Sequence, residues 1–549
     1  MTNVQFYATV NIMFLNISKT FSGNKQYTYL RIIESFRYKG KVKKRVVANL
    51  GQLSLINKDS LFQLGSSLIK YSGRRLPLLE ELESISALHY GEVITIKAIW
   101  DSLNLTSILK DSLSLRRKMN FNYPLSVFIM LLNCLIAPKS KLALTRWQER
   151  IYIESQRKPR YQHYLRALDY LASSKEKIEE FLFMRLTDLF SLKLNLIFYD
   201  LTSTYFEGQS CPIAKFGYSR DKRPDKKQIV LGLLVTDEGI PIAHQIYNGN
   251  ISDKTTLKAT IDTLMKRFQV KRCIFVGDRG LVSEENLTYL NLQGYPFIVA
   301  LRKRNSKEVE DLLKDVPSDY HILSNILYLK ELTIKDTRYL ICKNPQKQQD
   351  DKIFRDNLIK TISSELKKLS KNAQSNLRRA AEILATKKAK RYFIIGIDKQ
   401  NNFFWRLNND VINYEKELDG VYILKTNVLD IKASEVVKAY KNLSQVEDAF
   451  REIKDFLKLR PIYHYSTSRV KGHVMVCVLA YLIETILGKS LKTHVSISPR
   501  EALEHLDTLR LVENKLNGRR LLCVTTPSRE HRQILKSVGI TNLPRILQV

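Results

Sequence analysis

NLIFYD, at residues 195–200, is an apolar segment of strand length that ends in an acid, and CIFVGD, at residues 273–278, repeats this arrangement. An acid at the end of a buried strand costs free energy unless it is paired or binds a metal ion. We therefore interpret Asp200 and Asp278 as candidate metal ligands. Two alternatives remain open: Asp200 as an acid that begins a loop, and Asp278 as the ion-pair partner of Arg279.

The segments around these two acids alternate between strand and helix patterns. Apolar runs bounded by turn residues predict a hairpin of two strands, Gln228–Thr236 and Ile240–Tyr247. Helical periodicity predicts helices over Asp253–Phe268 and Ser283–Leu292, and Tyr295–Ala300 predicts a further strand. With the two strands that end in aspartate, the order is β-β-β-α-β-α-β, which predicts an α/β fold.

A third acid, Glu447, lies on a predicted helix over residues 433–457. At about 100° per residue, Tyr440, Glu447 and Lys454 follow one edge of an apolar stripe, and Arg451 lies one turn beyond Glu447. An acid flanked by an aromatic hydroxyl and two cations suits a metal ligand beside phosphate-binding groups. The alternative is an ordinary amphipathic helix with an i,i+4 pair of Glu447 and Arg451.

The charge of the chain indicates a polyanionic partner. It has 89 Lys and Arg against 55 Asp and Glu, a formal net charge of +34. Cations placed on phosphates release counterions, so an excess of this size favours nucleic acid as the partner. The alternative is a basic protein that binds nucleic acid only nonspecifically.

Other function classes find little support in the sequence. The sequence contains neither a basic amphipathic anchor nor a run of 18 apolar residues, so it does not predict a membrane protein. No signal peptide is visible. None of the six cysteines forms a CxxC pair, which argues against a zinc site and a disulfide framework. We therefore expect a cytoplasmic protein that acts at the nucleoid.

Seven segments, in this order and at these separations, resemble the bacterial insertion-sequence transposases of the Asp-Asp-Glu class with a tyrosine–arginine–glutamate–lysine signature. The segments are IFYDLTSTYFEG (197–208), GYSRDKRPDKKQIVLGLLVTDEGIPI (217–242), GNISDKTTL (249–257), VGDRGL (276–281), DGVYILKTN (419–427), YKNLSQVEDAFREIK (440–454) and RVKGHVMVCVLAYLI (469–483). With the N-terminal β segment, the likeness covers nearly the whole chain.

The resemblance implies a ribonuclease H-like core, a mixed sheet with a helical N-terminal region and a β-containing insertion before the glutamate helix. It divides the chain into six expected parts. These are a small β module (1–55), a helical DNA-binding region (56–190), the first part of the catalytic core (191–301), a basic insertion (302–432), the second part of the core (433–490) and a C-terminal region (491–549).

By resemblance, Asp200, Asp278 and Glu447 bind two Mg²⁺ ions, with Mn²⁺ as the alternative metal. Tyr440 and Lys454 match the tyrosine and lysine of the signature, which contact DNA at the end of the element. The arginine of the signature falls at position 443, where this chain has leucine.

Further residues are candidates for DNA contacts. Arg451 could supply the charge that Leu443 lacks. Trp405 lies in the insertion, where related enzymes use an aromatic residue to hold a flipped base; the alternative is a core residue. Lys222 and Arg223 could hold phosphates, or could belong to a solvated loop.

The expected function is cut-and-paste transposition. The partners would be the terminal inverted repeats of the element and its target DNA. A homodimer would pair two ends in a synaptic complex, because each end needs one active site. Two alternatives remain: a catalytically impaired DNA-binding descendant, motivated by Leu443, and a nuclease of the same fold that does not transpose.

Overall fold

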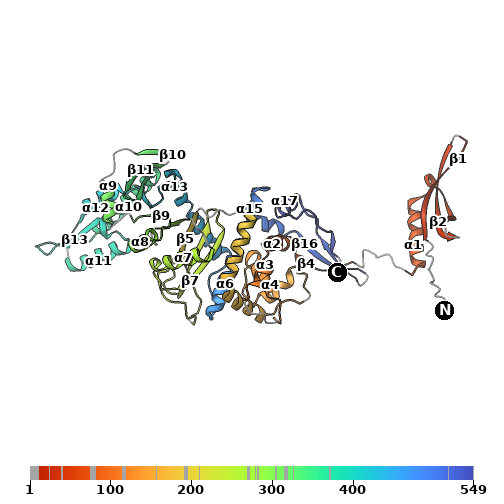
Figure 1. Ribbon diagram of the computed structural model, residues 1–549, viewed down its shortest axis with the longest axis horizontal. Coiled ribbons are helices and arrows are strands. Elements are labelled where there is room, and N and C mark those ends of the chain that lie inside the picture. The colour runs from red at the N-terminus through yellow and green to blue at the C-terminus, as the bar shows by residue number, and fades with distance from the viewer. Residues whose placement is uncertain are drawn as a thin grey trace. The chain divides into compact units, whose positions relative to one another are not determined.

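The computed structural model describes most of the chain: residues 12–23, 25–38, 41–73, 82–113, 119–155, 157–190, 196–208, 210–268, 273–278, 280, 283–302, 306–314, 320–324, 327–369, 373–516 and 519–547. The chain divides into two compact units, which are residues 1–86, 512–523 and 546–549, and residues 87–511 and 524–545. The elements of both are labelled in Figure 1.

The N-terminal segment forms an antiparallel sheet of β1 (Ile12–Ser22), β2 (Lys25–Tyr38) and β3 (Lys41–Gln52), followed by η1 (Leu53–Leu55) and α1 (Lys58–Tyr71). All three strands lie within the segment expected as a small β module, residues 1–55. A four-stranded sheet with the order β18-β17-β16-β4 combines one strand from the N-terminal part of the chain with three strands near its C-terminal end. Its strands are β4 (Glu83–His89), β16 (Arg510–Leu516), β17 (Arg519–Val524) and β18 (Ile546–Leu547).

The centre of the larger unit is a nine-stranded sheet with the order β10-β11-β12-β15-β9-β8-β5-β6-β7. Five of its strands form the predicted core: β5 (Leu196–Tyr205), β6 (Gln228–Thr236), β7 (Pro241–Asn248), β8 (Ile274–Gly277) and β9 (Phe297–Ala300). β5, β6 and β7 pair antiparallel, whereas β8 lies parallel to both β5 and β9. With α7 (Asp253–Phe268) and α8 (Glu284–Leu292), this confirms the ribonuclease H-like mixed sheet.

One strand differs from its prediction. The sequence suggested that a strand ends at Asp200, but β5 continues to Tyr205 and pairs with β6 along its whole length. The residues after Asp200 include Thr202, Ser203 and Thr204, which are buried and β-compatible, so the antiparallel ladder continues past the acid. Asp200 is therefore paired with β6 on one side of β5, whereas on the other side it lies just past the last residue pair between β5 and β8.

The segment expected as an insertion partly extends the same sheet. β15 (Val421–Thr426) pairs antiparallel with β9, and β12 (Thr337–Lys343), β11 (Leu327–Ile334) and β10 (His321–Ser324) follow it outward. The other elements of this segment are α9 (Lys307–Lys314), α10 (Pro345–Lys367), α11 (Ala373–Thr386), η4 (Lys390–Tyr392), β13 (Phe393–Ile397), β14 (Phe403–Leu407) and α12 (Asn409–Glu417). α10, α11 and the β13–β14 hairpin share a small core of their own.

The remaining helices of the larger unit gather around α15 (Thr467–Lys492), which packs against α2, α4, α6 and α16. Their bounds are α2 (Gly91–Ser102), α3 (Leu105–Asp111), α4 (Tyr123–Ile136), α5 (Leu144–Trp147), η3 (Gln148–Arg150), α6 (Tyr161–Phe190), α16 (Pro499–Leu506) and α17 (Arg529–Ser537). α15 is long and apolar enough to cross a membrane, but 78% of its most apolar window is buried in the protein. It is therefore a core helix.

The core sheet is covered on both faces. Tyr199 and Leu201 of β5 pack with residues of α7 and α8 in one cluster. Phe198, the neighbour of opposite parity, packs in the large cluster that also holds the buried residues of α13, α14 and α15. Because successive side chains of a strand point to opposite faces, this division assigns a face to every residue of β5 and β8.

Candidate active site

The register of the parallel strands places the two aspartates side by side. Tyr199 on β5 pairs with Gly277 on β8, so the next residues along the two strands are Asp200 and Asp278. Asp200 has the parity of Phe198, and Asp278 has the parity of Val276, and both apolar residues belong to the same core cluster. The two carboxylates therefore leave the sheet at adjacent positions and on the same face.

The glutamate comes to this face on α14 (Ser444–Arg451). The helix contacts β5 and β6, and its buried residues Val446, Ala449 and Phe450 join the cluster that holds Phe198. Glu447 follows Val446 and lies at the exposed border of this packed surface. The charges of Asp278 and Glu447 each raise the pKa of Asp200, so all three carboxylates lie within electrostatic reach of one another.

The surroundings of Asp200 shift its pKa strongly. Its pKa is raised to about 7, first because burial disfavours the carboxylate and then because of the charges of Asp278 and Glu447. The Leu201 N–H, which donates to Asp200 Oδ1 at 2.7 Å, and the Arg220 guanidinium oppose this rise. Half of the Asp200 population would therefore hold a proton near neutral pH unless a cation replaces it.

Glu447 shows the same effect more weakly. Burial raises its pKa first, and the charges of Asp278 and Asp448 raise it further, whereas Arg451 lowers it. Two crowded acids that both favour protonation are the expected state of a carboxylate site in the absence of its cation. Oxygen ligands of this kind suit hard divalent ions, and Asp200, Asp278 and Glu447 together could hold them.

The helix that carries Glu447 is not the continuous helix that the sequence predicted. α13 (Ala433–Lys441) ends before a turn at residues 442–443, α14 follows, and residues Glu452–Phe456 form a π-helix, η5. The seven-residue spacing from Tyr440 through Glu447 to Lys454 therefore does not place these residues along one straight edge. The buried side chain of Leu443 lies at the turn and packs in the same core cluster as the buried residues of the two helices.

The remaining signature residues have protein partners. Tyr440 stacks on Tyr422 with ring centroids 6.2 Å apart. Lys454 is buried, and its Nζ donates to Asp221 Oδ1 at 2.6 Å. Arg451 is exposed and pairs with Asp448, its neighbour one turn back, although its charge also acts on Glu447.

The loop after β5 holds two more of the predicted DNA-binding residues. Lys222 is exposed, with a φ of +56°. Arg223 makes a two-pronged ion pair with Asp225 at 2.8 and 2.7 Å and lies over the ring of Tyr205. Both cations lie at the surface of the same loop, but neither is among the groups that shift the pKa of Asp200 or of Glu447.

Trp405 lies far along the chain, on β14. It is half-buried and packs against Phe393, with ring centroids 6.0 Å apart, at the edge of the small core of the insertion. Arg279, the alternative partner of Asp278, lies outside the described residues.

Sequence reasoning missed a set of charged residues in the same loop. Arg220 acts on Asp200 and pairs with Asp253 at 2.5 Å, while its backbone N–H donates to Ser203. Asp221 accepts hydrogen bonds from both Lys454 and Arg460. The alternation of acids and bases in SRDKRPD, residues 219–225, is the signal that could have identified these residues.

Comparison with known proteins agrees with this geometry. The family model described as "Transposase DDE domain" matches residues 193–483, and that of the "IS1634 family transposase, N-terminal domain" matches residues 15–77. No curated protein matches the chain. A solved structure of the piggyBac transposase synaptic complex with hairpin DNA is 10% identical, with a TM-score of 0.37 over 76% of this chain and 79% of that chain.

The DDE match spans more than half of the chain and both of its ends lie beyond the three carboxylates. Enzymes with this domain cleave and transfer DNA strands and use divalent metal ions. The chain therefore belongs to the DDE transposases of insertion sequences and is a DNA transposase.

Proposed function

We propose that this transposase moves its insertion sequence by a cut-and-paste reaction, with Asp200, Asp278 and Glu447 as the ligands of two Mg²⁺ ions. The observation that carries the proposal is the pairing of Tyr199 with Gly277, which sets Asp200 beside Asp278 on the face covered by α14. Mn²⁺ offers the same ligand preferences and is the alternative metal.

The carboxylates explain how the site would be assembled. When bound, the ions would activate a water molecule and stabilise the oxygen that leaves the cut strand. Two ligands come from adjacent strands of a buried sheet and the third from a packed helix, so the positions of all three are fixed before DNA arrives. The proton that Asp200 favours near pH 7 would be displaced as it becomes a ligand.

The surrounding cations would position the DNA. Arg220 lies within electrostatic reach of Asp200. Further cations lie at the surface of the loop after β5, which carries Lys222 and Arg223, and of α14, which carries Arg451. Phosphate contacts of this kind fix register without reading sequence. Water would first cut the strand at the end of the element, and the freed 3′-hydroxyl would then attack the target strand.

Two subunits would act together, because each element has two ends and each chain has one such site. We expect a homodimer bound to both terminal inverted repeats in a synaptic complex, working on the nucleoid in the cytoplasm. Tyr440, Lys454 and Trp405 remain proposed DNA contacts, and their partners within the protein would have to be exchanged for DNA groups.

The test uses the purified full chain, Mg²⁺ and a plasmid that carries its gene with flanking DNA. Asp278→Asn keeps the shape of the side chain and removes a ligand charge, and Asp237→Asn, at the exposed turn between β6 and β7, is the matched control. We expect discrete cuts at both flanks and joined products with the wild type and the control, and neither with Asp278→Asn.

Other outcomes would select the alternatives. Binding to the flanks without cutting, in wild type and variant alike, would identify a catalytically impaired DNA-binding descendant, for which Leu443 is the motivating residue. Cutting without joined products would identify a nuclease that does not transpose.

A further inference from the structure

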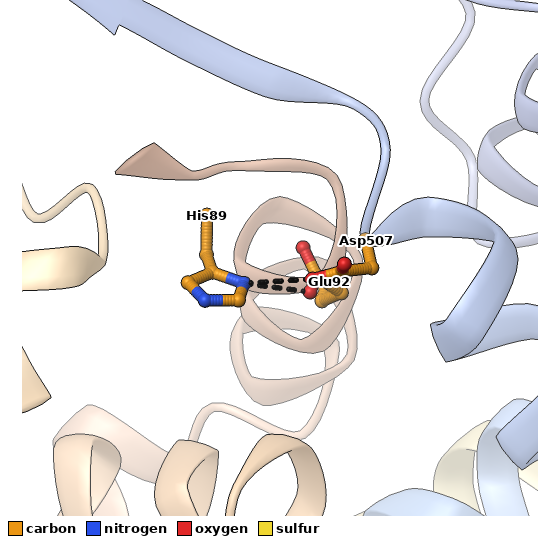
Figure 2. Close-up of side chains that lie close together, drawn as sticks. All are labelled: His89, Glu92 and Asp507. Carbon is orange, nitrogen blue, oxygen red and sulfur yellow. Dashed lines mark hydrogen bonds and ion pairs between the residues drawn. The ribbon is translucent and has the colours of Figure 1, made fainter. Parts of the chain in front are cut away.

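A second group of ligand-type side chains lies in the larger unit, on elements that carry none of the three catalytic carboxylates. His89 ends β4, Glu92 lies in the first turn of α2, and Asp507 is the C-cap of α16. His89 Nδ1 lies 2.9 Å from Glu92 Oε1 and 3.1 Å from Asp507 Oδ1. Figure 2 shows both carboxylates turned toward the same ring nitrogen. The three candidate ligand atoms all lie within 4.8 Å of one another.

Burial makes this arrangement costly without a further positive charge. The Glu92 side chain is 1% exposed, and its second oxygen, Oε2, is buried with no hydrogen-bond partner in the part of the chain that the structure describes. One Nδ1–H can satisfy only part of the demand of two facing carboxylates. The nearby cation Arg510 donates to Asp507 at 2.5 Å and therefore balances that acid rather than Glu92. A buried carboxylate oxygen without a partner normally marks a missing water or ion.

The cavity beside these residues is also lined by more acidic than basic side chains. It measures about 360 Å³, and its lining includes four acids, Glu92, Glu484, Glu504 and Asp507, and one cationic residue, Arg500. Arg500 is already engaged by Glu452 and Glu484. Glu484 also has a buried oxygen without a partner among the described residues. In a chain with a net charge of +34, a cavity whose lining has this excess of acids favours a small cation.

We propose that His89, Glu92 and Asp507 form a site for one divalent transition-metal ion of the Zn²⁺ class. Imidazole nitrogen and carboxylate oxygen are both ligands that Zn²⁺ takes in proteins, and the cavity would supply water for the fourth position beside three protein ligands. The imidazole disfavours Mg²⁺, which takes oxygen ligands. The hydrogen bond from Arg510 to Asp507 would remain as support, because ligating carboxylates are commonly hydrogen-bonded in turn.

The position of the site indicates a structural role. An ion held there would tie the end of β4 and the start of α2 to the end of α16, residues that are far apart in the sequence. Gly91 N–H already donates to Leu509 O at 2.8 Å across the same junction. The ion would strengthen this junction and leave the chemistry of Asp200, Asp278 and Glu447 unchanged.

The experiment measures Zn²⁺ binding to the chelator-treated full chain in an Asp200→Asn/Asp278→Asn background, which removes most binding at the catalytic carboxylates. We expect one Zn²⁺ per chain by metal analysis after dialysis, and an increase of Tm on adding Zn²⁺ but not on adding Mg²⁺ at the same concentration. His89→Ala and Glu92→Gln should weaken Zn²⁺ binding by about tenfold or more, in line with the effect of losing metal-site groups.

His494→Ala is the matched control, because the exposed side chain of His494 bonds only its neighbour Thr493 among the described contacts. It should bind Zn²⁺ as the parent does. If His89→Ala does not fold, Glu92→Gln decides, since it keeps the size of the side chain. No Zn²⁺ binding by the parent, or equal binding by the parent and Glu92→Gln, would overturn the proposal and identify the group as an ion-pair cluster.

Discussion

Lys454 Nζ donates a hydrogen bond to Asp221 Oδ1 at 2.6 Å, which joins the π-helix after α14 to the loop after β5. Arg460 donates to the same carboxylate oxygen. The Asp221 side chain is only 2% exposed and that of Lys454 only 9%. One buried acid therefore balances two cations, one of which is the lysine that the signature assigns to DNA.

Asp221→Asn should destabilise the protein strongly. The amide keeps the shape but leaves Lys454 without its counter-charge and Arg460 with only Asp455, and breaking a buried pair of this kind costs about 3–5 kcal/mol. The measurement is the free energy of unfolding in urea. Asp225→Asn, which breaks only the exposed pair with Arg223, should cost far less, because solvent screens an exposed ion pair. Equal losses in the two variants would contradict the assignment of Asp221 as the buried counter-charge.

Asp200 should make the metal-free protein less stable as the pH rises. Its pKa is about 7 in the folded state and near the ordinary 3.8 when unfolded, so between these values the folded state holds more protons. Stability then falls with rising pH across that window and levels off above pH 7. Asp200→Asn removes the titration, so its Tm advantage over the wild type should grow from pH 4 to pH 7 and then stay constant.

Thermal unfolding in the presence of a chelator, at pH 4, 5.5, 7 and 8, measures this difference. Asp336→Asn, at the exposed turn between β11 and β12, serves as the control for the loss of a carboxylate from the same sheet. A Tm difference between Asp200→Asn and the wild type that does not change with pH would rule out the raised pKa. Adding Mg²⁺ at pH 8 should reduce or reverse the advantage of Asp200→Asn, because only the wild type gains the ion as a ligand partner.

The sequence predicted the strand order well because the order follows from local patterns, and the three acids, whose catalytic role stays a prediction, were identified from the same patterns. Apolar runs that end in Asp200 and Asp278 mark strands whatever lies around them, and β-β-β-α-β-α-β was confirmed by the sheet. Three features depend on distant contacts and could not be read locally. The first is the continuation of β5 past Asp200, which needs β6 beside it. The second is the break at Leu443, whose side chain packs in the core. The third is the pairing of β15 with β9 and of β12 with β15, which extends the predicted sheet.

The strands and the helix that carry the candidate acids could be predicted from the sequence, but the partners of the nearby cations could not. Asp200, Asp278 and Glu447 come from segments whose patterns announce a strand or a helix. The partners of Lys454 and Arg220 come from a loop, where side-chain direction depends on tertiary packing. For the same reason, Tyr440 and Lys454 as DNA contacts, and Trp405 as a base contact, stay predictions.

Leu443→Arg should not restore a signature arginine. Leu443 is 7% exposed and lies in the core at the turn between α13 and α14, so an arginine there would bury a charge or open the turn. We expect a loss of several kcal/mol and no gain in cleavage rate. Leu443→Met, which nearly conserves volume, should cost less than about 1.5 kcal/mol and cut DNA as the wild type does. A Leu443→Arg variant with wild-type Tm and faster cleavage would instead place the missing arginine in the active site.

Gly472 should tolerate no side chain, because it sets the closest approach of α15 to α6. A Cβ added there would lie 2.2 Å from the carbonyl oxygen of Leu168, and backbone atoms of a packed helix cannot move aside as a flexible side chain can. Gly472→Ala should therefore separate the two helices at a cost of about 1–3 kcal/mol or more.

Gly65→Ala is the matched control on an exposed helix. Gly65 lies inside α1, and an added Cβ would meet no atom within 4 Å, so alanine should stabilise α1 by about 0.5–1 kcal/mol through its higher helix propensity. Thermal unfolding followed by circular dichroism compares each variant with the wild type. The two substitutions are chemically identical, so opposite signs would isolate the packing of α15 on α6 as the cause. A Gly472→Ala variant as stable as the wild type would mean that these helices are free to move apart, and that the core beneath the active site is less tightly packed than the contact with Leu168 indicates.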